Sequence, residues 1–232
     1  MKSVDKYVYP GTTVLINKFN CQDAEKLREI EALSTGGNLA YLQLHPIKGK
    51  YDFKHLKDIH HFIFQDMFDW AGQIRTIDIG KGNLFCRAQF IESYAESVFE
   101  DFLSSCYEAR SDRERFVDIF AKHYADMNAL HPFREGNGRA QREFARELCI
   151  ECGYVFDLTQ TTHEEMLEAS IKSFDTGNND GFVSIFGRNI IPMGQHTFEQ
   201  FAKEAGAVYH VKRIVLVNTD IIDEYLENFR DM

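Results

Sequence analysis

Apolar positions recur every three to four residues along most of the chain, which is the spacing of helices that bury one face. Asp23 and Asp52 are suited to cap the first two helices, and Gly36-Gly37 is suited to end the first. Ser111 and Glu114 have the spacing of a capping box. We expect helices over 23–33, 53–69, 89–106, 112–129, 138–153, 162–174 and 179–190.

The period changes to about two over residues 74–79, and the turn-forming run Gly80-Lys81-Gly82-Asn83 follows. This pattern predicts a short β-hairpin over 74–87. Beyond Pro192 the chain changes character again: residues 208–217 are typical of a strand and 220–229 of a short acidic helix. We therefore expect a mainly helical domain over 7–190 and a C-terminal appendage over 191–232.

Composition narrows the class of protein. The 232 residues include 20 Phe and only 4 Pro, which favours a helical fold with a substantial core. A net charge of −10 argues against a nucleic-acid binder, because such proteins need a basic surface. We find no apolar run long enough for a membrane helix and no secretory leader. Five scattered cysteines indicate a reduced, cytosolic protein, with export into another cell left open.

Residues 131–142, His-Pro-Phe-Arg-Glu-Gly-Asn-Gly-Arg-Ala-Gln-Arg, place a base, an acid, a glycine-rich turn and two arginines at a predicted helix start. Gly136, Asn137 and Gly138 allow backbone N–H groups to converge where the helix dipole favours anions. Arg139 and Arg142 share the polar side of the helix and can bind further phosphate oxygens. The segment therefore predicts a polyphosphate site.

Glu135 would repel a bare phosphate, and a divalent cation resolves this conflict. Mg²⁺ is commonly held by one or two carboxylates together with ligand phosphates and water, so we interpret Glu135 as its protein ligand. His131 has an intrinsic pKa near neutrality and is suited to act as the general base that activates a hydroxyl.

The same twelve residues resemble the signature of the Fic family, H-P-F-x-D/E-G-N-G-R-x-x-R, at every fixed position. The resemblance extends over residues 7 to about 190. It includes Tyr9-Pro10-Gly11-Thr12, the run from Ile63 to Gly72, Ile74-Arg75-Thr76, and Ala129-Leu130.

The resemblance implies a helical bundle with a small β-hairpin flap, and transfer of AMP from ATP to a Ser, Thr or Tyr hydroxyl of a target protein. It implies that His131 is the base, that Glu135 carries Mg²⁺, and that Asn137 with the loop amides holds phosphates. Arg139 and Arg142 would steer the β- and γ-phosphates. The flap that docks the target would comprise Ile77, Asp78, Ile79, Gly80, Lys81, Gly82 and Asn83.

Many Fic proteins are inhibited by a helix carrying S/T-x-x-x-E-G/N, whose glutamate pairs with the second arginine of the signature. Residues 223–228 match this only in part, with Glu227-Asn228 in place and Asp223 where Ser or Thr is expected. Inhibition by Glu227 in cis and inhibition by a separate small antitoxin protein both stay open. In either case the resemblance implies a toxin or effector.

Two alternative functions compete with AMP transfer: a Fic-type transferase of another phosphate-containing group, and a masked nucleotide-binding module. Other candidate sites have simpler explanations. Cys149 and Cys152 are expected on the apolar side of their helix, as small buried residues. His60 is expected to be a core histidine whose ring nitrogens are hydrogen-bonded.

Overall fold

A computed structural model describes residues 5–81 and 83–193. The predictions for 208–217, for 220–229 and for Glu227 lie outside the described residues. The elements run in the order α1 (Ala24–Leu44), α2 (Phe53–Phe64), β1 (Gly80–Lys81), β2 (Asn83–Leu84), the 3₁₀ turn Ala88–Phe90, α3 (Ile91–Phe99), α4 (Phe102–Ala109), α5 (Arg113–Leu130), α6 (Asn137–Glu151), β3 (Tyr154–Phe156), α7 (His163–Thr176), α8 (Asp180–Asn189) and β4 (Ile190–Pro192).

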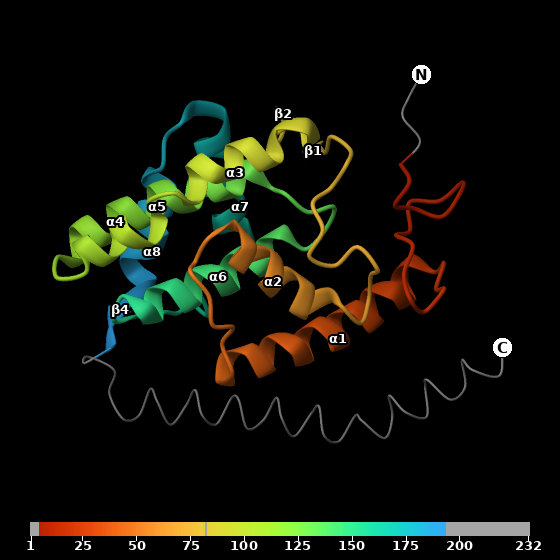
Figure 1. The fold of residues 1–232 in the computed structure, drawn as a ribbon, viewed down its shortest axis with the longest axis horizontal. Helices are drawn as coiled ribbons and strands as arrows, with labels where there is room; N and C mark the ends of the chain where they lie inside the picture. The colour runs from red at the N-terminus through yellow and green to blue at the C-terminus, as the bar shows by residue number, and fades with distance from the viewer. Residues whose placement is uncertain (1–4, 82, 194–232) are drawn as a thin grey trace.

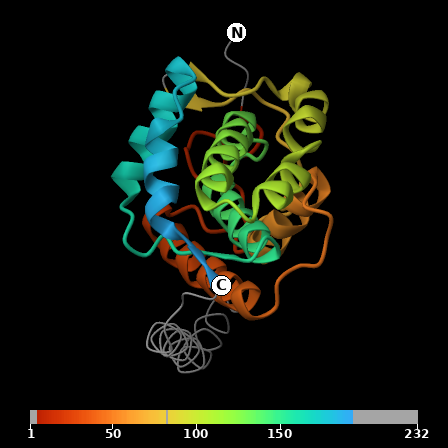
Figure 2. The same cartoon turned by 90° about the vertical axis from the view of Figure 1, so that its left-hand side faces the viewer.

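The helices are arranged around α5, which packs against α3, α4, α6, α7 and α8. Viewed along the bundle, α3 and α4 lie on one side of α5 and α7 and α8 on the other (Figure 2). α6 packs on α2, which in turn packs on α1 along the lower edge of the molecule (Figure 1). The apolar side of α6 is buried as predicted, with Ala140, Phe144, Leu148 and Cys149 inaccessible to solvent. This burial holds the start of α6 in place, and the residues of the predicted polyphosphate site lie there.

The first helix is longer than predicted, because α1 continues through Gly36-Gly37 to Leu44. Each glycine costs a helix about 1 kcal/mol relative to alanine. Burial of Thr35 and Leu42 on either side of the pair offsets this cost. The prediction that the glycines end the helix was wrong because tertiary packing outweighs local propensity here.

Three further boundaries differ from prediction. α2 ends at Phe64, where the carbonyl accepts from both Met67 N and Phe68 N and the chain turns a corner. The helix expected over 89–106 is broken between Phe99 and Phe102. α5 is capped by Asp112, which accepts from Arg115 N, so the predicted capping box at Ser111 is not the cap.

The hairpin is present but short. β1 pairs antiparallel with β2, with Gly80 opposite Leu84 and Lys81 opposite Asn83. Residues 74–79 do not form a strand, because the Arg75 N–H donates to the carbonyl of Pro132 instead of to a neighbouring strand. A second small sheet was not predicted: β3 pairs antiparallel with β4, which joins residues 190–192 to the end of α6.

Candidate active site

The motif loop spans residues 131–136, between the end of α5 and the start of α6. It begins at His131, whose φ of 43° and ψ of 61° lie in the left-handed region. It ends at Gly136, with a φ of 79°. A β-carbon at Gly136 would lie 2.1 Å from Cζ of Phe64, so the loop packs directly on α2. Both the backbone angle and the close packing require glycine at this position.

The Asn137 side chain closes the loop on itself. Its Oδ1 accepts from Phe133 N at 2.8 Å, and its Nδ2 donates to Phe133 O at 2.8 Å. The side chain is buried, so its amide shapes the loop. The backbone N–H groups of Asn137 and Gly138 donate to no acceptor in the described part of the chain. Two unsatisfied donors at a helix N-terminus are the arrangement that can bind an anion.

The imidazole of His131 is held from two directions. Nδ1 lies 3.2 Å from the carbonyl of Asn128, and since a carbonyl only accepts, Nδ1 carries the proton. In the neutral ring, Nε2 is therefore the nitrogen that can accept a proton. The ring also stacks on Phe85 of the hairpin segment, with centroids 3.8 Å apart and planes inclined by 8°. Phe85 is itself supported by Phe174 of α7. The environment of His131 thus fixes both its tautomer and its ring plane.

Glu135 is the exposed carboxylate of the loop. Its Oε1 accepts from Gly136 N at 2.9 Å and lies 3.9 Å from a guanidinium nitrogen of Arg139. The side chain is 49% exposed, so a metal ion can reach it from solvent. Within residues 5–81 and 83–193 there is no cluster of three or more His, Cys, Asp or Glu that could hold a metal alone. A single carboxylate suits an ion that also binds phosphate oxygens and water.

The two arginines of the motif differ in their surroundings. Arg139 pairs with Glu31 of α1, donates to Oγ1 of Thr35 at 3.2 Å and lies over the ring of Phe64. Arg142 is exposed, and no described residue accepts from it. Both arginines and Arg146 border a cavity of about 190 Å³ between α6 and the Leu39–Gln43 side of α1. Arg142 is therefore the arginine that can turn to an incoming anion.

His60 joins the loop to α2. Its Nδ1 accepts from Gly72 N at 2.9 Å, so its Nε2 donates to the carbonyl of Glu135 at 3.0 Å. The ring stacks on Phe133 at a centroid distance of 3.8 Å. Burial lowers the pKa of His60 from 6.5 to about 3, which keeps the ring neutral and this hydrogen-bond pattern fixed. The residue is a core histidine, as expected, and it also supports the loop.

Comparison with known proteins identifies the family. The model of the Fic/DOC family matches residues 50–149, which include α2, the hairpin, α5 and most of α6. A probable protein adenylyltransferase Fic of Escherichia coli is 32% identical over 193 residues, covering 82% of this chain and 94% of its own length. The chain belongs to the Fic family.

Two other Fic relatives extend the comparison. Protein adenylyltransferase VbhT of Bartonella schoenbuchensis is 36% identical over 81% of this chain, although the chain spans only 39% of the length of VbhT. The N-terminal Fic domain of a VirB-translocated Bep effector from Bartonella quintana, solved with bound ADP, superposes with a TM-score of 0.75. It is 27% identical, and the match covers 80% of this chain and 94% of that one. The predicted family, the mainly helical fold and the assignment to the protein adenylyltransferases are confirmed.

A second family model, of a family of unknown function, matches residues 187–229 of this Fic protein. Most of these residues lie outside the described part. Among the residues described, no helix is both long and apolar enough to cross a bilayer.

Sequence reasoning missed the residues that support the Fic motif from other elements. Phe85, Glu31 and Asn128 contact the motif, yet none was predicted to do so. Arg75 was noted only as part of the resemblance, and it donates to the carbonyl of His131. A lone arginine between Ile74 and Ile77, in a segment of apolar alternation, was the one available signal.

Proposed function

We propose that this Fic protein transfers AMP from ATP to a hydroxyl side chain of a target protein. One observation carries the proposal. The motif loop places a histidine that donates from Nδ1, so that Nε2 is the proton-accepting nitrogen of the neutral ring. The adjoining start of α6 presents two N–H groups that lack an acceptor among the described residues. A base beside an anion site is the arrangement that phosphoryl chemistry requires.

In this mechanism Nε2 of His131 accepts the proton of the target hydroxyl. The oxygen attacks the α-phosphorus, the new P–O bond forms, and the bond from the α-phosphorus to the α,β-bridging oxygen breaks. Pyrophosphate leaves. The N–H groups of Asn137 and Gly138 and the guanidinium of Arg142 bind phosphate oxygens. They orient the α-phosphorus and stabilise the negative charge that moves to the leaving group. Arg139 contributes mainly by holding Glu135 and α1 in place.

The residues present fit Mg²⁺. Glu135 supplies one exposed oxygen-donor side chain at a helix start, which is the protein contribution that this ion needs beside a polyphosphate. When bound, Mg²⁺ would neutralise phosphate charge. Glu135→Gln should weaken binding of ATP in the presence of Mg²⁺ and leave binding in EDTA unchanged, as measured by calorimetry. Equal losses in both conditions would contradict the assignment of Glu135.

The hairpin Gly80–Leu84 is proposed to dock the target, within the flap that begins at Ile77. Its backbone can pair with an extended target segment by strand addition, a mode that tolerates many side chains. The side chains of residues 81–83 are outside the structural description. We therefore assign this role to the backbone of the hairpin.

We further propose that a glutamate restrains the enzyme by pairing with Arg142. Arg142 is exposed beside a cavity that is also lined by Arg139, Arg146 and Glu143. Because Arg139 pairs with Glu31 and Arg146 with Glu143, Arg142 is the arginine of this cavity that can attract an incoming glutamate. The glutamate would be Glu227 of this chain or would come from a separate antitoxin protein. Glu227→Gly should raise transfer several-fold if it acts in cis. Unchanged activity, with a small protein co-purifying from the native host, would assign inhibition to that partner.

The test of the function uses ATP labelled at the α- or γ-phosphorus and a lysate of the native host. Protein label from α that is lost in His131→Ala and kept in His45→Ala supports AMP transfer. His45 is an exposed histidine at the end of α1 and serves as the matched control. Label from γ alone would indicate a kinase, and nucleotide binding without transfer by either Glu227→Gly or wild type would favour a masked binding module.

A further inference from the structure

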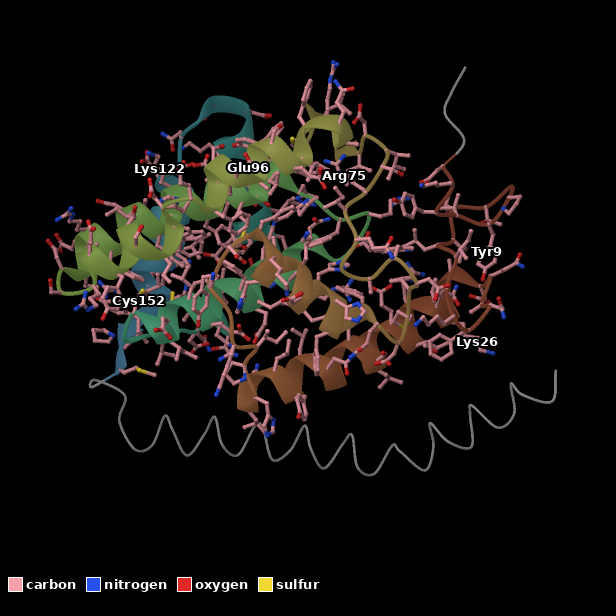
Figure 3. All side chains as sticks on the ribbon, viewed as in Figure 1. Tyr9, Lys26, Arg75, Glu96, Lys122 and Cys152 are labelled. Atoms are coloured by element: carbon pink, nitrogen blue, oxygen red, sulfur yellow. The ribbon has the colours of Figure 1, made fainter. Side chains whose placement is uncertain are left out.

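Arg75 is a charged side chain in an unusual place. It lies at the base of the hairpin, beneath the start of α3 (Figure 3), and is only 1% exposed. Among the described residues no carboxylate lies within ion-pairing distance of it. Burial lowers the pKa of the guanidinium from its usual value. Burying an unpaired charge is costly, so its contacts must matter to the fold or to the site.

Three carbonyls from three segments surround the guanidinium. Nε donates to the carbonyl of His131 at 2.9 Å, Nη1 donates to the carbonyl of Ile77 at 2.8 Å, and Nη2 donates to the carbonyl of Cys86. The backbone N–H of Arg75 adds a hydrogen bond of 2.9 Å to Pro132 O. One side chain thus connects the histidine of the motif to the segments entering and leaving the hairpin.

The connection is closed by two contacts that do not involve Arg75. Cys86 N donates to the carbonyl of Ala129 at 3.1 Å, next to the end of α5. The ring of Phe85 stacks on the imidazole of His131. The backbone of His131 is therefore held by Arg75, and its ring is held by the residue that precedes Cys86. A shift of the hairpin base must therefore move the backbone of His131, its ring, or both.

We propose that Arg75 is a positioning residue that makes the hairpin base and His131 one rigid unit, so that a target hydroxyl docked on the hairpin meets Nε2 in register. The expected loss of kcat rests on the proposed AMP transfer, whereas the expected change at the His131 ring does not. Arginine is required because its planar fork donates in three directions at once, whereas lysine presents a single point charge.

The first experiment compares Arg75→Lys with wild type. The 15N shifts of the His131 ring report which nitrogen carries the proton, and they need no target. We expect a single Nδ1–H tautomer in wild type and a mixture in Arg75→Lys. Arg113→Lys is the matched control, because Arg113 also donates to two carbonyls, Ile190 O and Gly187 O, at a remote place on α5. An unchanged His131 signal in Arg75→Lys overturns the proposal.

The second experiment uses the target that α-labelled ATP identifies. With that protein, Arg75→Lys should lower kcat by about 100-fold, the effect expected for a small misplacement of a catalytic group. The affinity for Mg²⁺ with α,β-methylene-ATP should change less than about twofold, because α6 is untouched. Equal losses of kcat and nucleotide affinity would show a general collapse and overturn the proposal.

The two readouts separate this inference from the proposed function. A tautomer change in Arg75→Lys together with a wild type that labels no protein would refute AMP transfer and leave the positioning role intact. If Arg75→Lys does not fold, hydrogen exchange in wild type decides. The amide protons of His131, Phe85 and Cys86 should then exchange through one shared opening, with the same free energy of opening at all three. Separate opening of the hairpin and of His131 overturns the proposal.

Discussion

Gly136→Ala is the substitution whose cost can be worked out most directly from the structure. Two effects add at this position. A residue with a β-carbon in the left-handed region costs about 1–2 kcal/mol, and the φ of Gly136 is 79°. The new β-carbon would also lie 2.1 Å and 2.3 Å from two ring carbons of Phe64, against a normal carbon–carbon contact of about 3.5–4.0 Å.

The ring of Phe64 has little room to give way. It stacks on His60 at a centroid distance of 4.6 Å, and the guanidinium of Arg139 lies over it at 4.6 Å. Overpacking of this kind costs about 1–3 kcal/mol. The two effects together predict that Gly136→Ala lowers the free energy of unfolding by about 2–5 kcal/mol. The loop should also shift, which weakens binding of Mg²⁺ and ATP.

The chain contains matched controls for the backbone effect alone. Gly153 and Gly177 have φ of 85° and 71°, and a β-carbon at either position would meet no atom within 4 Å. Gly153→Ala and Gly177→Ala should therefore cost only about 1–2 kcal/mol. Urea unfolding measures all three variants. Against a Phe64→Leu background, the cost of Gly136→Ala should fall towards that of the controls. If Gly136→Ala costs no more than Gly153→Ala, the packing argument is wrong.

Two further predictions concern the arginines and the pH dependence of stability. Arg142→Ala should change the free energy of unfolding by no more than about 0.5 kcal/mol and weaken MgATP binding about tenfold or more. Arg139→Ala should instead lower the free energy of unfolding by about 1–3 kcal/mol, because it leaves Glu31 without its partner. Thermal unfolding and calorimetry distinguish the two variants, and reversed results would contradict the roles assigned. Burial against Phe102 lowers the pKa of His123 from 6.5. The unfolded chain therefore binds this proton more readily, and stability should decline as the pH falls below about 6.5. Unfolding curves at several pH values should show a weaker decline in His123→Gln than in wild type, and parallel curves would refute this.

The candidate site was predictable from sequence where its residues are contiguous. His131, Glu135, Gly136 and Gly138 lie in one loop and one helix start, so local rules for glycine, proline and helix termini were enough to place them. The apolar side of α6 was equally local, since a helical period decides which residues are buried. The same rules failed for α1, because the packing that carries the helix past Gly36-Gly37 involves distant elements.

The supporting contacts could not be predicted, because each joins segments far apart in sequence. His60 is 75 residues from Glu135, and Arg75 is 56 residues from His131. No periodicity or spacing within the chain encodes such pairs. Their residue types still gave a partial signal. A histidine on the apolar face of α2 and an arginine in an apolar segment both require buried acceptors or donors, and in each case the motif loop supplies a backbone carbonyl.

The two arginines of the motif show how a fold can assign different roles to residues that a helical wheel treats alike. Arg139 and Arg142 are one turn apart on the same side of α6, but α1 passes beside Arg139 and supplies Glu31 and Thr35 to it. Arg139 also lies 3.9 Å from Glu135 and so offsets charge on the carboxylate that we propose as the magnesium ligand. Its positive charge is therefore largely engaged before any nucleotide binds. Arg142 has no such partner among the described residues, so a triphosphate or an inhibitory glutamate would compete for this one guanidinium.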